Sequence, residues 1–209
     1  MIAVIDYGMG NLHSVAKALE HVADGVPVQV TSDPAVIAAA ERVVFPGQGA
    51  ARDCMREIDE HGLRAAITTA MQDKPFLGIC MGLQVLFDHS AEGDTPCLGL
   101  LSGEVKRFAR DLTNAAGERL KVPHMGWNRV RQTQTHPLWS GIFDDERFYF
   151  VHSYFVVPQD ATIVTGVTDY PAAFVCAVAH ANLFAVQFHP EKSAAAGLRL
   201  LKNFVTWQP

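Results

Sequence analysis

Short apolar runs alternate with segments of helical periodicity through the first half of the chain. The apolar runs lie at residues 1–6, 42–45 and 75–79, and apolar side chains recur at helical spacing over residues 12–22. Strands that alternate with helices build βαβ units, in which right-handed crossovers make neighbouring strands parallel. This half therefore predicts an α/β fold with a mostly parallel sheet and helices on its faces.

The second half of the chain has a different pattern, in which strand-like runs are separated by turns. The runs lie at residues 104–108, 127–131, 147–157, 162–168, 173–179 and 183–188. Such spacing is typical of antiparallel strands, and residues 193–207 then form a closing helix. A chain of 209 residues with no repeat predicts one domain spanning residues 1–209, with an antiparallel region added to the parallel sheet.

Composition excludes several functional classes. The formal net charge is -5, which leaves no basic footprint for nucleic acid. No run approaches 18 apolar residues, and the N-terminal residues lack the basic segment of a signal peptide, so we expect a cytoplasmic protein without a membrane span. The four cysteines are far apart with no CxxC pair, which argues against disulfides and against a metal site.

The segment GICMG, residues 78–82, places Cys80 between two glycines where a strand turns into a helix expected over residues 82–87. This is the form of a nucleophile elbow, a strained turn that lifts a reactive side chain above the sheet edge. The free N–H groups of a following helix favour a thiolate. The alternative is a small, inert core cysteine, the role expected for Cys54, Cys97 and Cys176.

A base for this cysteine is available in the segment His189-Pro190-Glu191, which follows the strand-like run 183–188. The spacing lets the Glu191 carboxylate reach one ring nitrogen of His189, which leaves the other nitrogen to exchange a proton with Cys80. Alone, this segment is equally compatible with a solvated surface loop.

The segment FPGQG, residues 45–49, is a third glycine-rich turn at a strand end. Its backbone N–H groups, at Gln48 or Gly49, are candidate donors to an oxyanion, together with the N–H of Met81. A phosphate cradle is the competing use of such a loop, but the chain contains neither GxGxxG nor GxxxxGK[ST].

Together the three segments resemble the class I, triad-type glutamine amidotransferases, in the order found in that family and across nearly the whole chain. Four further segments resemble the glutaminase subunits of imidazole glycerol phosphate synthases within it: DYGMGNL at 6–12, PHMGWN at 123–128, YFVHSY at 149–154 and HPEKS at 189–193. PHMGWN is the most specific of these segments. The family's framework is a flavodoxin-like sheet.

The resemblance implies a catalytic triad of Cys80, His189 and Glu191 that hydrolyses glutamine through a γ-glutamyl thioester, with no metal or organic cofactor. It implies oxyanion donors at Gln48, Gly49 and Met81. The residues expected to hold L-glutamine are Gly47, Gln84, His152, Ser153 and Tyr154. The variable position of PGxG is Gln48 here, where this subfamily often has a small apolar residue.

The resemblance also implies a partner, a separate (β/α)8 cyclase subunit that forms a heterodimer with the chain. The cyclase would use the ammonia to make imidazole glycerol phosphate and AICAR in histidine biosynthesis. The residues expected to face this subunit are Asn11, Trp127, Tyr149 and Lys192. Tryptophan and tyrosine side chains are frequent anchors of interfaces.

Three alternatives stay open at the level of sequence. The chain could be the glutaminase subunit of an anthranilate or aminodeoxychorismate synthase, although PHMGWN argues against this. It could be a non-catalytic relative that only docks a partner, which the complete set Cys80, His189 and Glu191 argues against. It could also be a cysteine hydrolase on the same framework, in which the triad acid would stand elsewhere.

Overall fold

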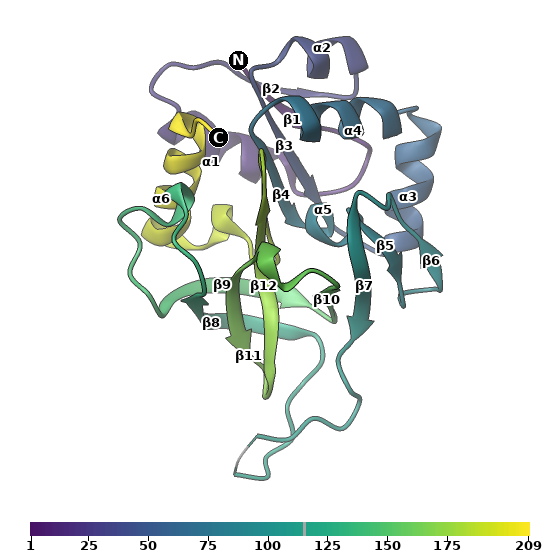
Figure 1. The fold of residues 1–209 in the computed structure, drawn as a ribbon, viewed down its shortest axis with the longest axis vertical. Coiled ribbons are helices and arrows are strands. Elements are labelled where there is room, and N and C mark those ends of the chain that lie inside the picture. Colours follow the sequence, from purple (N-terminus) through teal and green to yellow (C-terminus); the bar gives the residue numbers. More distant parts are fainter. Residues whose placement is uncertain (115) are drawn as a thin grey trace.

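The computed structural model describes residues 1–114 and 116–209, and a parallel sheet forms its centre (Figure 1). The parallel strands follow the order β2-β1-β3-β4-β13, which confirms the predicted flavodoxin-like arrangement. Their bounds are β1 Ile2–Ile5, β2 Val28–Thr31, β3 Arg42–Gly47, β4 Phe76–Cys80 and β13 Leu183–Val186.

Helices cover both faces of this sheet because its strands bury side chains on both sides (Figure 1). In β1, Ile2 and Val4 belong to the core beneath α1 and α6, whereas Ala3 and Ile5 belong to the core beneath the other helices. The helices are α1 Leu12–Val22, α6 Ala194–Thr206, α2 Pro34–Ala39, α3 Ala51–Glu60 and α4 Arg64–Asp73.

Antiparallel strands extend the sheet beyond β13, as the second half of the sequence predicts. The extension continues in the order β12-β10-β7-β5-β6, and β11, β8 and β9 pair successively from β12. The bounds are β5 Phe87–Ser90, β6 Thr95–Pro96, β7 Leu101–Arg107, β8 His124–Gln132, β9 Glu146–His152, β10 Tyr154–Pro158, β11 Val164–Asp169 and β12 Ala173–His180. Among the described strands of this region, β5 and β7 are the only pair that runs parallel.

Two predicted elements are wrong in extent. The helix expected over residues 82–87 is the single turn α5, Met81–Gln84, because the chain then enters β5 and Phe87 pairs with Leu101. The strand expected over residues 147–157 breaks at Ser153, where β9 leaves its pairing with β8 and β10 joins β7 instead. Both changes follow from pairing with distant strands, which local periodicity does not encode.

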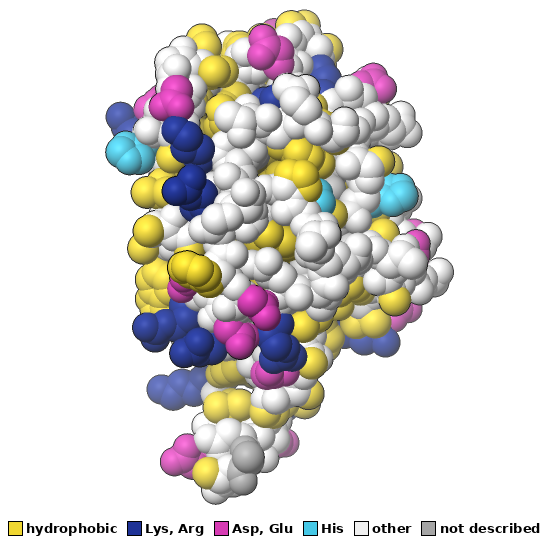
Figure 2. All heavy atoms as spheres, turned by 60° about the vertical axis from the view of Figure 1, so that its left-hand side comes forward, with side chains coloured by type: hydrophobic (Ala, Val, Ile, Leu, Met, Phe, Trp, Pro, Cys, Tyr) yellow, Lys and Arg dark blue, Asp and Glu magenta, His cyan; other side chains and the backbone are white. Residues whose placement is uncertain are grey.

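The side of the molecule that carries α1 and α6 has a mixed surface, with acidic and basic side chains interspersed among apolar ones (Figure 2). Among the described residues no helix combines the length and apolar character needed to cross a membrane.

Candidate active site

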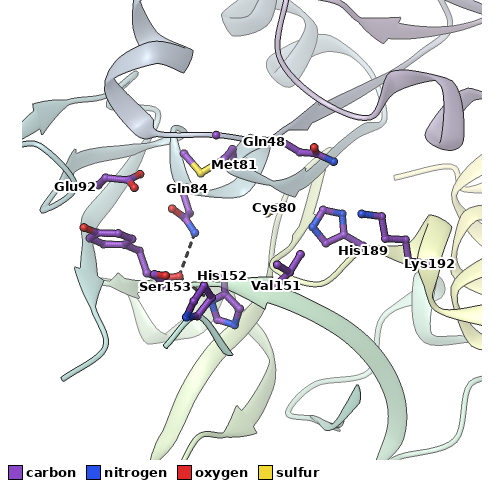
Figure 3. A pocket seen from close by; sticks show the side chains of 13 residues that line it. Gln48, Cys80, Met81, Gln84, Glu92, Val151, His152, Ser153, His189 and Lys192 are labelled. Carbon is purple, nitrogen blue, oxygen red and sulfur yellow. Dashed lines mark hydrogen bonds between the residues drawn. The ribbon is translucent and has the colours of Figure 1, made fainter. Parts of the chain in front are cut away.

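The three glycine-rich or histidine-bearing segments singled out from the sequence meet at the carboxyl edge of the sheet, where ligands bind in folds of this kind. They follow β3, β4 and β13, which are neighbours in the sheet. They border a cavity of about 380 Å³ (Figure 3). Its walls are formed by Gln48, Gly49, Cys80, Met81, Gln84, Glu92, Pro123, Val151, His152, Ser153, Tyr154, His189 and Lys192.

Cys80 occupies a strained turn between β4 and α5. Its φ angle is 55°, a left-handed value that a residue with a side chain rarely adopts. Neither flanking glycine has room for a side chain: a Cβ at Gly82 would lie 1.8 Å from the Phe45 carbonyl oxygen, and one at Gly78 would lie 2.8 Å from the Gly82 oxygen. The elbow therefore forms as predicted, although α5 is one turn long and its dipole is smaller than expected.

His189 and Glu191 form a buried pair beside Cys80. The ring nitrogen Nδ1 lies 2.8 Å from Glu191 Oε1, and the two side chains are 3% and 1% exposed. Burial alone lowers the pKa of His189, but the Cys80 sulfur and the Glu191 carboxylate outweigh it and raise that pKa to about 10. His189 Nε2 is buried with no hydrogen-bond partner among the described residues, so it is free to exchange a proton in the cavity.

Backbone contacts to β9 position His189. Its N–H donates to the Tyr149 carbonyl at 2.9 Å, and the Tyr149 N–H donates to Ser193 Oγ at 2.9 Å. The Ser193 hydroxyl in turn donates to the His189 carbonyl at 2.6 Å. The turn that carries the histidine is thus docked on the hairpin β8–β9. Ser193 was recognised from the sequence only as a member of the HPEKS segment, without this role.

The loop after β3 forms another part of the cavity wall. Gln48, Gly49 and Met81 line the cavity, whereas Gly47 lies behind the wall, where a Cβ would be 2.1 Å from the Tyr7 hydroxyl. The Cys54 thiol donates to the Gln48 carbonyl at 3.3 Å. Burial raises the pKa of Cys54 to about 12, which fits the structural role predicted for it.

Gln84 points into the cavity from the end of α5 (Figure 3). Its Nε2 donates to the Tyr154 carbonyl at 3.1 Å and to Gln187 Oε1 at 2.9 Å. Its Oε1 is buried and has no hydrogen-bond partner in the described part of the chain, so it remains available as an acceptor. Gln187 is a residue that sequence reasoning missed, and its Nε2 lies 3.7 Å from Cys80 Sγ.

A pair of buried histidines connects the cavity with the PHMGWN segment. His152 Nδ1 lies 2.8 Å from the Tyr154 carbonyl, which can only accept, so that nitrogen carries the proton. His152 Nε2 then accepts from His124 Nδ1 at 2.9 Å, and Asn128 Nδ2 donates to His124 Nε2 at 3.3 Å. This directed chain explains why PHMGWN combines a histidine with an asparagine.

The two histidines predict sensitivity to acid. Burial lowers the pKa of His124 to about 4 and that of His152 to about 3, against about 6.5 in an unfolded chain. Below pH 6.5 the unfolded chain takes up protons that the folded chain does not. We therefore expect the free energy of unfolding to fall as the pH falls, by about 2 kcal/mol per histidine at pH 5.

Urea unfolding between pH 7 and pH 5 measures this loss. The variant His124→Asn removes one of the histidines whose pKa is lowered by burial, a group that also includes His136, and should make the dependence less steep. The exposed control His61→Gln should leave it unchanged. An equally steep loss in His124→Asn would contradict the assignment.

The residues expected at a partner surface either line the cavity or lie on segments that contact its lining. Trp127 is 50% exposed and packs edge-on against Tyr149, with ring centroids 6.0 Å apart. Lys192 lines the cavity itself. Asn11 caps α1 by accepting from the Ser14 N–H, in the turn whose Gly10 packs against the loop after β3.

One lining residue, Glu92, carried no signal in the sequence, and two more, Pro123 and Val151, appeared there only as members of the PHMGWN and YFVHSY segments. Glu92 lies on a turn after β5, and its Oε2 accepts from the Ala51 N–H at 2.8 Å at the start of α3. The contact joins segments 41 residues apart, which explains why no local motif revealed it.

Comparison with known proteins is consistent with this geometry. The glutamine amidotransferase class-I family matches residues 3–207. The imidazole glycerol phosphate synthase subunits HisH of Thiobacillus denitrificans and Dechloromonas aromatica are each 68% identical to the chain over 209 residues. The alignments cover the whole chain and 92% and 97% of those proteins.

Solved structures share the fold at low sequence identity. A glutamine amidotransferase crystal structure superposes with a TM-score of 0.72 at 16% identity, covering 98% of this chain and 97% of that one. The glutaminase domain of Trypanosoma brucei CTPS gives 0.65 at 18% identity, covering 100% and 94%. The match over nearly the whole chain and the full-length identity to the bacterial subunits establish that the chain belongs to the class-I glutamine amidotransferases and, within them, to the imidazole glycerol phosphate synthase subunit HisH family.

Proposed function

We propose that the chain hydrolyses L-glutamine to glutamate and ammonia, with Cys80 as nucleophile, His189 as acid and base, and Glu191 as the group that orients His189. This proposal rests on the buried pair His189–Glu191. The Nε2 atom of His189, which has no hydrogen-bond partner among the described residues, borders the same cavity as a cysteine in a strained elbow. Residues 1–209 act as a single glutaminase domain.

The reaction proceeds in two steps. The Cys80 thiolate attacks the side-chain amide carbon of glutamine, and protonated His189 gives its proton to the departing nitrogen, so that ammonia leaves and a γ-glutamyl thioester remains. A water molecule then attacks the thioester carbon while His189 takes up its proton, which releases glutamate and returns the thiolate. The N–H of Met81, which has no intrahelical partner, and N–H groups of Gln48 or Gly49 stabilise the oxyanion in both steps.

The substrate is held by polar groups on the side of the cavity opposite His189 (Figure 3). The unpartnered Gln84 Oε1 and the Glu92 carboxylate lie on that side (Figure 3) and suit the α-ammonium group of glutamine. Backbone groups of residues 152–154 complete the pocket. A cavity of about 380 Å³ lies within the usual range for small-molecule sites.

The ammonia is delivered to the cyclase subunit of imidazole glycerol phosphate synthase, in a heterodimer in the cytoplasm. Two contacts support the inference that the active site responds to the binding of this partner. Strand β9, which carries Tyr149 beside exposed Trp127, holds the backbone of His189. Gly10, next to Asn11, packs against Gly47 at the end of β3. The high identity to HisH subunits favours this assignment over a subunit of an anthranilate or aminodeoxychorismate synthase.

Glutamate release from glutamine tests the proposal. The purified chain is assayed alone, and then with the cyclase subunit and its nucleotide substrate. We expect little activity from the isolated chain and a large rise with the liganded partner. Substantial activity that is indifferent to the cyclase would retain the cysteine chemistry and contradict the assigned partner.

A further inference from the structure

Gln187 is a fully buried amide beside the proposed nucleophile, and the mechanism above gives it no role. It follows β13 directly, and its backbone N–H donates to the Cys176 carbonyl at 2.8 Å, which fixes the position of its Cα. Both ends of its side chain contact residues of the cavity: Oε1 accepts from Gln84 Nε2 at 2.9 Å, and Nε2 lies 3.7 Å from Cys80 Sγ.

The orientation of this amide is determined by a backbone carbonyl. The Tyr154 oxygen can only accept, and it accepts from Gln84 Nε2 at 3.1 Å, so the Gln84 side chain must turn its NH2 group to that side. The same NH2 group also faces Gln187, which must therefore present Oε1 to it. The remaining end of the Gln187 amide, its NH2 group, is thereby directed at the sulfur.

We propose that Gln187 is a further catalytic residue, whose Nε2–H donates to the Cys80 sulfur and stabilises its thiolate form. The inference rests on the proposed function, because it assigns Gln187 to the same nucleophile. A hydrogen bond to an ionised acceptor is stronger than one to a neutral acceptor, so the contact favours the thiolate over the thiol. The low exposure of Cys80, at 6%, leaves few water molecules to provide the same stabilisation.

A purely structural role does not account for this side chain. A fully buried amide such as that of Gln187 costs free energy unless both of its ends are hydrogen-bonded. Here the two ends are bonded to Gln84 and Cys80, which belong to the proposed catalytic and binding machinery. A leucine of similar volume would fill the space without this cost.

The rate of Cys80 alkylation by iodoacetamide, measured from pH 5 to pH 10, tests the proposal without requiring glutamine turnover. Only the thiolate reacts, and peptide mapping separates Cys80 from the other three buried cysteines. In Gln187→Leu we expect the midpoint of the pH profile to rise by about one unit and the rate at neutral pH to fall about tenfold.

Two further variants keep the test decisive if Gln187→Leu folds poorly. Gln187→Glu keeps the shape and the bond from Gln84 but places a carboxylate at the sulfur, so its midpoint should rise further. Gln84→Met removes the group that orients the amide and should give a smaller rise. The exposed control Gln159→Leu should keep the parent profile.

Each result has one interpretation. Upward shifts in Gln187→Leu or Gln187→Glu, with a melting temperature near that of the parent, support the role of Gln187. An unchanged midpoint in a folded Gln187 variant overturns it and leaves the proposed function intact. A parent chain whose Cys80 shows no alkylation below pH 9 would overturn the proposed nucleophile, and the role of Gln187 with it.

Discussion

The substitution Cys80→Ala is expected to abolish glutamine hydrolysis, lowering kcat by at least ~10⁴-fold, because no other group in the cavity can form the thioester. The fold should survive, since an alanine fills most of the cysteine volume and the flanking glycines, which set the turn, are unchanged. Glutamate release by the complex with the cyclase subunit measures the loss, and sedimentation or calorimetry checks that the two chains still associate.

A matched control separates the effect of losing the nucleophile from the general effect of losing a buried thiol. Cys97 is also buried, but it lies outside the cavity, so Cys97→Ala should retain activity. Glutamine hydrolysis retained in Cys80→Ala would contradict the proposed mechanism.

Glu191→Gln is expected to have the second-largest effect, a fall in kcat of about 10²–10⁴-fold. The amide has nearly the same shape, but it removes the negative charge that holds His189 protonated and oriented. Because Glu191 is one of the groups that raise the pKa of His189 toward 10, the alkaline limb of the kcat profile should move to lower pH in the variant. Steady-state assays from pH 6 to pH 10 follow both changes.

An exposed carboxylate provides the comparison. Glu104 forms a surface contact with Lys106, and Glu104→Gln should leave both kcat and its pH profile unchanged. A Glu191→Gln variant with parental kcat and an unshifted alkaline limb would show that the carboxylate does not act on His189.

The parallel half of the fold and the groups proposed for catalysis were predictable because their signals are local. Alternating apolar runs define the strands. The glycines beside Cys80 indicate a tight turn that only small neighbours permit, because a Cβ at Gly82 would collide with the Phe45 carbonyl oxygen. The spacing of His189 and Glu191 likewise places two groups on one short turn, so their contact needs no knowledge of the fold.

Residues that act across the chain were not predictable in the same way. Glu92 joins the cavity through a bond to the start of α3, and Gln187 reaches Cys80 from a strand 107 residues away. The shortness of α5 illustrates the same limit. Phe87 is not helical because it pairs with Leu101 of β7, a strand that lies outside the local sequence window. The roles of such residues depend on sheet order, which emerges only when the strands pair.

The pairing of β4 with β13 has a consequence for protein synthesis. The nucleophile stands at the end of β4, while its neighbour in the sheet is made more than a hundred residues later, when the last fifth of the chain leaves the ribosome. Until then β4 presents an open edge, which invites aggregation and delays native pairing. A product that ends before residue 183 thus carries Cys80 without His189, the base proposed for it. On the proposed mechanism, such a fragment releases no ammonia.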